Sequence, residues 1–447
     1  MNWKRLLRRP PPGCVDACGA GFVEGWAWDA RIPDGPVHVE IFDDKVLIGT
    51  APANGYREDL LAAGIGNGVH GFRFALPGGA TPRAVRVVIA GTGIELPGAK
   101  TRPRPVPGYY RRFTPLLEHG LWCVDDISLS PDALRFAGWA LRPPSASACT
   151  FLVNGRPCRE QRFPLPRDDV HRRFPYLAGA ERTGFQCTAD VLPSDAGVFE
   201  LAFAESGEYN QYFTVDDLPL PEPERRQRVH GNRDEGSFRL EGFSAYCKLE
   251  QALRRFGRSF DDCPRILDWG CGCGRVTRYF HRQGIHGVDI DADNIEWCRR
   301  NLPAGTFETI PMHPPAAAPA GRFPVIIGIS VFTHLRQAVM LEWLEWLRRA
   351  LEPGGLALVS VHGDTAWARS AASPLKLYRK WRKRGILDDF PNADLESVLA
   401  AADRSYYRST FHTREYVQST WSRYFEILDV LPGYIGNLQD LVIMRYS

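Results

Sequence analysis

Three glycines alternate with other residues in a short segment suited to binding a ligand through backbone groups. The segment runs from Asp268 to Gly274 and reads DWGCGCG, directly after an apolar strand predicted at 265–267. Glycine lets the chain turn sharply and leaves no side chain between the backbone and a ligand. Residues 275–280 predict a helix, whose first N–H groups have no partner within the helix. The G-x-G-x-G spacing differs from the dinucleotide pattern G-x-G-x-x-G, so alone it indicates only a close approach of some ligand.

An acidic residue at the end of the next predicted strand narrows the kind of ligand. Asp289 lies in the segment 287–291, next to Ile290, and follows Asp268 at the interval of about 20 residues that is typical of nucleoside-binding α/β folds. A carboxylate at this place can accept hydrogen bonds from both hydroxyls of a ribose. The two segments together predict a cofactor that contains a nucleoside.

The elements that must position this loop alternate between strands and helices from residue 236 onward, which indicates a parallel α/β sheet. Further strands are predicted near 306–309, at 325–330 and at 356–361. The segment 341–351 predicts an amphipathic helix, because its apolar residues recur at helical spacing. A Glu-Pro-Gly-Gly turn at 352–355 ends it.

Residues 236–447 resemble a class I, Rossmann-like methyltransferase that depends on S-adenosylmethionine. Four landmarks in the family's order carry the resemblance: Asp268–Gly272 as motif I, Asp289 as the ribose acid, Ser330–Leu335 after strand four, and Leu351–Gly355 before strand five. The resemblance implies S-adenosylmethionine as the cofactor and a seven-stranded sheet with an antiparallel last strand.

Two further segments bear on this resemblance. Residues 424–431 and 438–445 fit the final hairpin of the family's sheet. Pro324 stands where the family usually has an aspartate that caps a strand. We expect this departure to weaken one contact and to leave catalysis intact.

The resemblance also implies the residues that contact the cofactor. They are Asp268, Gly270, Cys271, Gly272, Asp289, Ile290 and Ser330. The alternative for the loop is an ordinary tight turn in another Rossmann-like protein, such as a dehydrogenase. Asp268 alone could also be a cap at the end of its strand, without contact to a cofactor.

Two histidines are candidates for a general base. His334 lies just beyond strand four, where the resemblance places the mouth of the substrate site, and His412 lies in a polar and aromatic stretch, 406–414, that we expect to cover the site. A neutral histidine near pH 7 can take the proton of a sugar hydroxyl, although much of methyl transfer from an activated donor is positioning. A hydrogen-bonded structural histidine is the alternative for each.

The first half of the chain contains an internal repeat. Gly25-Trp26-Ala27 recurs 113 residues later, Gly71-Phe72 recurs at the same offset, and Arg57 with its acidic neighbours recurs 110 residues later. Strand signals lie in both copies: residues 37–42 alternate before a turn, and Asn154–Gly155 is a strong hairpin signal. Three landmarks in one order at nearly one offset indicate a duplicated β domain.

The fold class that follows is multidomain. Two tandem β-sandwich-like repeats, 13–100 and 121–217, are predicted ahead of an α/β Rossmann-like seven-stranded methyltransferase domain at 236–447. Residues 100–107 and 218–235 are rich in proline and charge, and the second segment predicts an exposed hinge.

The two copies also resemble β modules fused to bacterial glycosyltransferases and methyltransferases of cell-surface polysaccharide pathways. This resemblance implies a glycan or glycan precursor as the acceptor. Trp26, Trp28 and Trp139 could stack on sugars, but tryptophan on a strand is more often a core residue. The basic run 376–384 could hold an anionic glycan or its lipid diphosphate carrier, and a solvated helix face is the alternative.

Composition excludes several other classes of function. The net charge of +3 comes with 52 acidic residues, and no Asn/Asp-Pro-Pro-aromatic motif follows strand four, so we expect no nucleic-acid partner. The 11 cysteines are odd in number and have no second ligand pair at zinc-like spacing, which predicts reduced thiols, no metal and a cytoplasmic protein. The basic start, 1–10, is not a signal peptide and predicts at most peripheral membrane contact.

The sequence therefore predicts a methyltransferase that O-methylates a cell-surface glycan or its precursor. A small-molecule methyltransferase whose β domains mediate oligomerisation is one alternative. A glycan-binding scaffold that has lost turnover is another. The oligomeric state is not predicted.

Overall fold

The computed structural model divides into two compact units, Met1–Gly108 and Tyr109–Ser447. It describes residues 12–19, 22–57, 60–61, 63–76, 85–98, 113, 121–141, 150–174, 177, 179–203, 209–280, 284–315, 321–370, 375–390 and 408–446. The basic start of the chain and the predicted linker at 100–107 lie outside these ranges.

The first unit holds two four-stranded sheets, which we call module 1 (residues 13–95). Their orders are β1 (Gly13–Gly19), β2 (Phe22–Ala27), β6 (Val69–Ala75), β5 (Gly55–Tyr56) and β4 (Val46–Ala53), β3 (Val37–Asp43), β7 (Val85–Ile89), β8 (Ile94–Glu95). The alternation predicted for β3 is present, because Val37, Val39 and Ile41 are buried in the core while the residues between them are exposed or half-buried. Side chains from both sheets form this core.

Module 2 (residues 122–214) belongs to the second unit and has two sheets of the same strand orders. They are β9 (Trp122–Leu129), β10 (Ala133–Ala140), β14 (Gly184–Asp190), β13 (Glu160–Leu165) and β12 (Arg156–Pro157), β11 (Phe151–Val153), β15 (Val198–Phe203), β16 (Gln211–Thr214). The predicted hairpin turn is Asn154–Gly155, where both residues have positive φ angles between β11 and β12. A short helix, α3 (Asp168–Arg173), follows β13.

The landmarks of the sequence repeat occupy matching places in the two modules. A Cβ atom on Gly25 would lie 2.2 Å from the carbonyl oxygen of Cys14, and one on Gly138 would lie 1.9 Å from that of Cys123. Arg57 pairs with Asp16 in module 1. In the same way, Arg167 pairs with Asp125 in module 2, at 2.7 Å.

The rest of the second unit, the α/β domain, contains the predicted seven-stranded sheet. Its order is β19 (Gly305–Thr309), β18 (Gly284–Asp289), β17 (Arg265–Trp269), β20 (Phe323–Gly328), β21 (Leu351–Val361), β25 (Gln439–Arg445), β24 (Glu426–Ile435). The first five strands are parallel, and β25 is antiparallel to both of its neighbours, as predicted. Pairing is irregular between Phe323 and Val325, on either side of the proline that replaces the family's aspartate.

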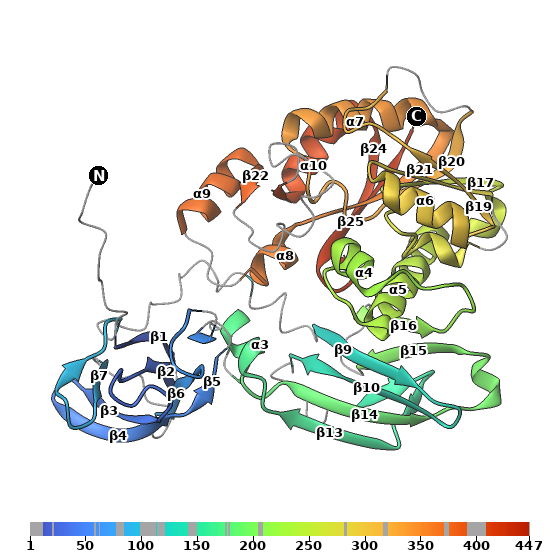
Figure 1. Ribbon diagram of the computed structural model, residues 1–447. Helices are drawn as coiled ribbons and strands as arrows, with labels where there is room; N and C mark the ends of the chain where they lie inside the picture. Colours follow the sequence, from blue (N-terminus) through green and yellow to red (C-terminus); the bar gives the residue numbers. More distant parts are fainter. Residues whose placement is uncertain are drawn as a thin grey trace. The chain divides into compact units, whose positions relative to one another are not determined.

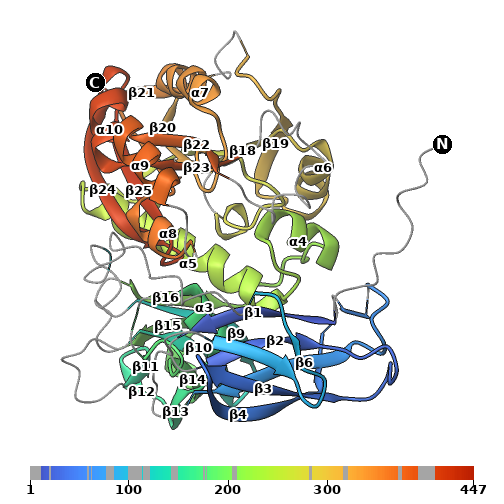
Figure 2. The same cartoon turned by 90° about the vertical axis from the view of Figure 1, so that its left-hand side faces the viewer.

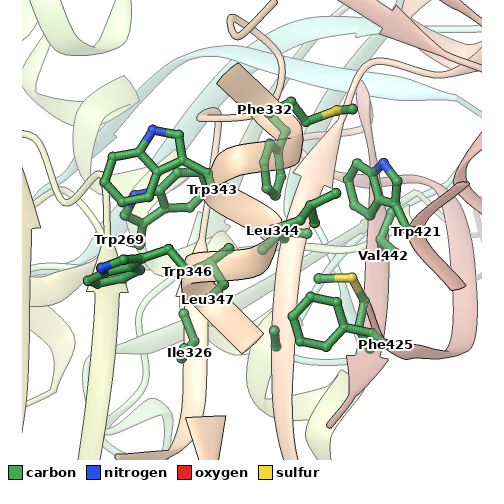
Figure 3. Close-up of a cluster of buried hydrophobic side chains, with 14 of the residues drawn as sticks. Trp269, Ile326, Phe332, Trp343, Leu344, Trp346, Leu347, Trp421, Phe425 and Val442 are labelled. Carbon is green, nitrogen blue, oxygen red and sulfur yellow. The ribbon is translucent and has the colours of Figure 1, made fainter. Parts of the chain in front are cut away.

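Helices and a small ribbon surround this sheet (Figure 1). They are α4 (Pro223–His230), α5 (Glu235–Arg254), α6 (Ala292–Asn301), α7 (Gln337–Ala350), α8 (Asp364–Ala368), α9 (Leu375–Arg384), α10 (Arg414–Thr420), and the ribbon β22 (Ile386–Phe390) with β23 (Ser409–His412). Figure 3 shows tryptophans of α7 packed against Trp269 of β17. The ring centroids of Trp269 and Trp343 are 5.2 Å apart.

The helix predicted at 275–280 is absent, and only a single 3-10 turn, Thr277–Tyr279, forms there. Side chains hold this segment in its own path. The Thr277 hydroxyl donates to the Asp268 carboxylate, and the fully buried Arg278 makes two hydrogen bonds to Asp216, of 2.6 and 2.9 Å. These tertiary contacts outweigh the helical preference of the local sequence.

The prediction of an exposed hinge at 218–235 is wrong, because α4 forms inside it and packs on the domain. Proline at the first turn and a left-handed Gly231 after the last turn delimit this helix. Val229 packs against the cluster that includes Cys271 and Cys298. The buried Arg226 donates to the carbonyl oxygens of Pro221 and Arg233 and forms an ion pair with Glu235 at 3.6 Å.

Helix α5 lies beside strands of module 2 and joins the module to the α/β domain (Figure 2). Leu240 of α5 lies in the core of module 2. A Cβ on Gly236 would lie 2.2 Å from the carbonyl oxygen of Ile127 in β9, so the helix and strand backbones nearly touch. The buried Asn437, between β24 and β25, donates to the carbonyl oxygen of Trp122 at 2.6 Å. One continuous body results.

We expect Gly138→Ala to lower the free energy of unfolding by about 3 kcal/mol, because the added methyl group would overlap a backbone carbonyl that cannot move alone. Gly155→Ala in the same module is the control. Its Cβ would meet no atom within 4 Å, so only the left-handed backbone should cost about 1 kcal/mol. Urea denaturation measures both, and equal losses would contradict the assigned clash.

Candidate functional site

A cavity of about 460 Å³ opens at the carboxyl ends of β17, β18 and β20. Its volume lies in the range of about 300–1,000 Å³ that is usual for small-molecule sites. All seven residues predicted to contact the cofactor line it: Asp268, Gly270, Cys271, Gly272, Asp289, Ile290 and Ser330. The fold therefore brings together every residue of that set.

The glycine loop shows why glycine recurs at every second position. Gly270, Gly272 and Gly274 all have φ angles between +53° and +79°, a region that disfavours side chains. A Cβ on Gly270 would lie 2.3 Å from Val331, and one on Gly272 would lie 2.8 Å from Val229. A side chain at either position would overlap a neighbouring valine, so only glycine lets this loop, which we call the cradle, follow the cavity wall with its backbone.

Asp289 fastens this loop to the end of β18. One of its carboxylate oxygens accepts from the amide of Gly272 and the other from the amide of Asp291, both at 2.8 Å. Each oxygen has a further lone pair for a ribose hydroxyl. Burial raises the pKa of Asp289 to about 6, although the backbone N–H donors oppose the rise. The carboxylate is thus charged at neutral pH.

Asp268 lies at the end of β17 with 4% of its surface exposed. Its hydrogen-bond partner is the hydroxyl of Thr277, a side chain, whereas a strand-end cap would accept from a backbone amide. Burial raises the pKa of Asp268 to about 7, the Thr277 hydrogen bond opposes this, and the charge of Asp289 adds to it. A carboxyl group poised near neutrality in a cavity wall suits contact with a polar ligand.

Ser330 takes a left-handed conformation with φ of 64° at the end of β20. Its amide donates to the hydroxyl of Ser360 at 2.7 Å, and its own hydroxyl accepts from Nε2 of Gln439 at 2.8 Å. Ser360 in turn donates to Oε1 of Gln439 at 2.6 Å. Such strain in a residue other than glycine persists only where neighbours hold it, which is typical of functional sites.

The two candidate bases lie in different surroundings. His334 lines the cavity, and its Nδ1 lies 3.2 Å from the carbonyl oxygen of Arg408. A carbonyl can only accept, so Nδ1 carries the proton and the lone pair is on Nε2. Burial lowers the pKa of His334 to about 4, so the ring is neutral at pH 7.

His412 does not cover the site, and it is not among the described residues that line the cavity. It is 1% exposed on β23, with Nε2 at 3.2 Å from the sulfur of Met340 and the ring of Trp421 nearby. Burial lowers the pKa of His412 to about 3. The surrounding apolar side chains make it a structural histidine, which was its stated alternative. Residues 406 and 407 of the predicted cover lie outside the described part of the chain.

Several residues of the cavity wall were not predicted from the sequence. Arg228 and His230 come from α4, Glu241 comes from α5, Arg369 follows α8, and Cys123 belongs to β9 of module 2. For α4 a signal existed, since a proline at the first turn and a glycine after the last turn delimit a helix. Nothing in the local sequence indicates that a strand of module 2 reaches the cavity.

Charged groups gather where module 2 meets the cavity, a region that we call the polar end (Cys123, His230, Glu241, Arg275 and Arg369). Glu241 pairs with Arg275 at 2.9 Å and with Nδ1 of His230 at 3.2 Å. Burial opposes its ionisation, but the interactions with His230, Arg275 and Arg369 prevail and lower the pKa of Glu241 to about 2. Glu241 is therefore an anion across the physiological range.

The tryptophans considered for sugar stacking and the basic run 376–384 have structural contacts within the protein. Trp26 and Trp139 are buried, and the half-buried Trp28 donates to the carbonyl oxygen of Pro33. In α9, Tyr378 and Trp381 are buried in an apolar cluster. Basic side chains of α9 also pair with acidic ones: Lys380 with Asp389, Arg382 with Asp364 and Glu415, and Arg384 with Asp388.

No helix within the described ranges is long and apolar enough to cross a membrane. In the same ranges, no cluster of three or more His, Cys, Asp or Glu side chains could hold a metal ion. The cysteines that the structure describes are free thiols.

Asp289→Asn should weaken binding of S-adenosylhomocysteine, the product of the predicted cofactor, by about 10- to 100-fold. The reason is the loss of charged acceptors for the ribose hydroxyls. Asp293→Asn, an exposed change in the first turn of α6, is the matched control and should leave the affinity unchanged. Isothermal titration calorimetry measures both. Equal affinities of the two variants would remove Asp289 from the cofactor site.

The affinity of the protein for S-adenosylhomocysteine should fall as the pH drops through about 6. Asp289, with its pKa raised to about 6, is charged above this pH and accepts at both oxygens. Below this pH it is protonated and loses an acceptor. Asp268, with its pKa raised to about 7, titrates in a neighbouring range. Titrations from pH 5.5 to 8 with wild type and Asp289→Asn separate the two contributions. An unchanged pH profile in the variant would show that Asp289 does not contribute.

Comparison with known proteins agrees with this site. A protein family described as a methyltransferase domain matches residues 241–404, which is less than half of the chain. This range includes the glycine loop, Asp289, Ser330 and His334.

Several solved structures resemble about half of the chain. One is the PH0226 protein of Pyrococcus horikoshii OT3, with 16% identity, coverage of 51% of this chain and 100% of that chain, and a TM-score of 0.33. Another is the glycopeptide N-methyltransferase MtfA with S-adenosylmethionine, with 17% identity, coverage of 46% and 93%, and a TM-score of 0.32. A third is the N-methyltransferase NodS of Bradyrhizobium japonicum WM9 with S-adenosyl-L-homocysteine, with 14% identity, coverage of 50% and 97%, and a TM-score of 0.32.

The five parallel strands of the sheet and the glycine cradle with Asp289 lie within the residues that the family matches. Residues 241–404 thus carry a methyltransferase domain, and S-adenosylmethionine is its cofactor.

Proposed function

We propose that the protein O-methylates a hydroxyl group of a cell-surface glycan or of a glycan precursor. One observation carries this proposal: a single cavity joins the cofactor cradle to the polar end, where a residue of module 2 forms part of the wall. The acceptor and the methyl donor would then meet in a space that both the domain and the module enclose.

The chemistry of the polar end supports an acceptor rich in hydroxyl groups. The Glu241 carboxylate accepts hydrogen bonds, while the guanidinium of Arg275 beside it donates them. A sugar hydroxyl both donates and accepts, so neighbouring hydroxyls can satisfy such a pair together. A purely apolar acceptor would leave these charges desolvated, at a considerable cost in binding free energy.

In the proposed reaction the protein mainly positions the acceptor. S-adenosylmethionine, when bound, supplies a methyl group that its sulfonium already activates. The cavity walls hold a hydroxyl in line with that methyl group, which removes much of the entropic cost of the encounter. His334 is neutral at pH 7 and takes the hydroxyl proton on Nε2, because its Nδ1 proton is committed to the Arg408 carbonyl.

The β modules belong to this proposal in two ways. We infer that they are tandem β-sandwich copies, which their matching strand orders and the paired Arg57–Asp16 and Arg167–Asp125 contacts support. We also infer that module 2 helps to bind the acceptor, since Cys123 lines the cavity. Such a role argues against the alternative in which the β modules serve only for oligomerisation. The free, mostly buried thiols support a cytoplasmic location, and peripheral contact is the most that we propose for a membrane.

Transfer of labelled methyl groups tests the function directly. The purified protein and labelled S-adenosylmethionine are added to lysate fractions from a strain that lacks the gene. We expect label in a glycan or glycan-precursor fraction, in an ether that resists mild base. Label only in small molecules would favour the small-molecule alternative. Binding of S-adenosylhomocysteine without any labelled product would favour the scaffold.

His334→Ala should lower the rate of methyl transfer by about 100-fold or more, as expected for loss of a general base. Its affinity for S-adenosylhomocysteine should stay within twofold of the wild type. His412→Ala is the comparison, because it removes a buried ring outside the described cavity wall. It should lower the thermal midpoint but leave the rate per folded molecule unchanged. The proposal for His334 fails if both variants lose the same activity per folded molecule.

A further inference from the structure

Arg369 differs from the other arginines of the cavity wall because, among the described residues, it is not paired directly with a carboxylate. Arg228 pairs with Asp291 at 3.3 Å, and Arg275 pairs with Glu241 at 2.9 Å. Within the described ranges Arg369 makes no ion pair. The polar end thus contains one negative charge, on Glu241, against the positive charges of Arg275 and Arg369.

The guanidinium of Arg369 is fixed in position by both parts of the second unit. Its Nη1 donates to the carbonyl oxygen of Asn437 at 2.7 Å. Its central carbon lies 5.3 Å from the ring centroid of Trp139, on β10 of module 2. An arginine that lies over an aromatic ring and is tied to a carbonyl loses little further entropy when it binds a ligand.

Neighbouring groups compensate the charge of Arg369 only in part, because Glu241, which interacts with it at a distance, pairs directly with Arg275. Its Nε is buried and has no hydrogen-bond partner in the described part of the chain. The Cys123 thiol beside it is neutral, since burial raises the pKa of this thiol to about 11 although the charge of Arg369 opposes the rise. Asp125 of β9 also feels that charge, but it pairs with Arg167 at 2.7 Å. An anion bound in the cavity would pair with the charge of Arg369.

We propose that Arg369 binds a carboxylate or phosphate group of the acceptor, so that the methylated unit is an acidic sugar such as a uronic acid or a sugar phosphate. The inference rests on the proposed function and deepens it. The guanidinium has N–H donors beyond the one bound to Asn437, and such a donor makes a charge-assisted hydrogen bond to an oxygen of either group. The acid group would lie where Cys123 and Trp139 of module 2 meet the α/β domain. Module 2 would therefore select acidic acceptors by orienting Arg369.

Binding of simple probes tests the proposal without knowledge of the natural acceptor. The full-length protein is saturated with S-adenosylhomocysteine and titrated with methyl β-glucuronide, glucose 1-phosphate or neutral methyl β-glucoside, each at millimolar concentration. Ligand-observed NMR or calorimetry follows binding. We expect at least one anionic probe to bind about tenfold more tightly than the neutral one, as a charge-assisted pair implies. The anionic probe that binds more tightly shows whether the acid group of the acceptor is a carboxylate or a phosphate.

Variants of Arg369 test whether this residue causes the preference for the anionic probe. Arg369→Gln should abolish the preference for the anionic probe and leave the affinity for S-adenosylhomocysteine unchanged. Arg369→Lys keeps the charge and should retain part of the preference. Arg379→Gln, an exposed change on α9, is the matched control and should behave as wild type. Circular dichroism and the thermal midpoint verify that each variant is folded.

Other results would overturn the proposal. Equal binding of neutral and anionic probes, or no binding of either anion, removes the acid-binding role. A preference that survives in Arg369→Gln places it elsewhere. A large loss of S-adenosylhomocysteine affinity in folded Arg369→Gln would assign the arginine to the cofactor. Failure of the wild type itself to bind S-adenosylhomocysteine would instead contradict the proposed function, and this outcome is distinct from the others.

Discussion

The hydrogen bond from the Gly272 amide to the Asp289 carboxylate is the contact on which the site depends. It joins the loop after β17 to the end of β18, and the amides of Gly270 and Cys271 add bonds to the carbonyl oxygen of Val288. The chain can follow this path only with left-handed glycines, since side chains would meet Val331 or Val229. One bond thus sets the shape of the cradle and orients the carboxylate that faces a ribose.

A second constraint acts at the other end of the cavity, where two elements from distant parts of the chain are joined. Backbone contact at Gly236 and the Asn437 bond to Trp122 hold β9 against the α/β domain. Because Leu240 packs in the core of module 2, the module is not a detachable appendage. The polar end exists only in this arrangement, since Cys123 and Arg369 approach each other from the two sides of the junction.

The sequence predicted what local spacing and family order encode. Strand positions and the glycine loop follow from such spacing, whereas the seven-stranded sheet with its antiparallel last strand and the set of seven cofactor residues follow from the family resemblance. The predictions that were wrong concern segments whose structure is decided by tertiary contacts. The buried pair of Arg278 with Asp216 replaces the helix expected at 275–280, and the packing of Val229 turns the expected hinge into α4. His412 looked polar in sequence but lies among Met340 and Trp421.

The Asn437–Trp122 bond also has a consequence for the order in which the protein is made. Its partners are 315 residues apart, and domains generally begin to fold from the amino terminus while the ribosome is still working. The edge of module 2 would therefore wait, incomplete, until the last hairpin emerges. A chain that stops before this hairpin would lack part of both ends of the cavity, because Gln439, which donates to the Ser330 hydroxyl, also lies on the hairpin. Competence for methyl transfer is thus a property that the chain acquires last.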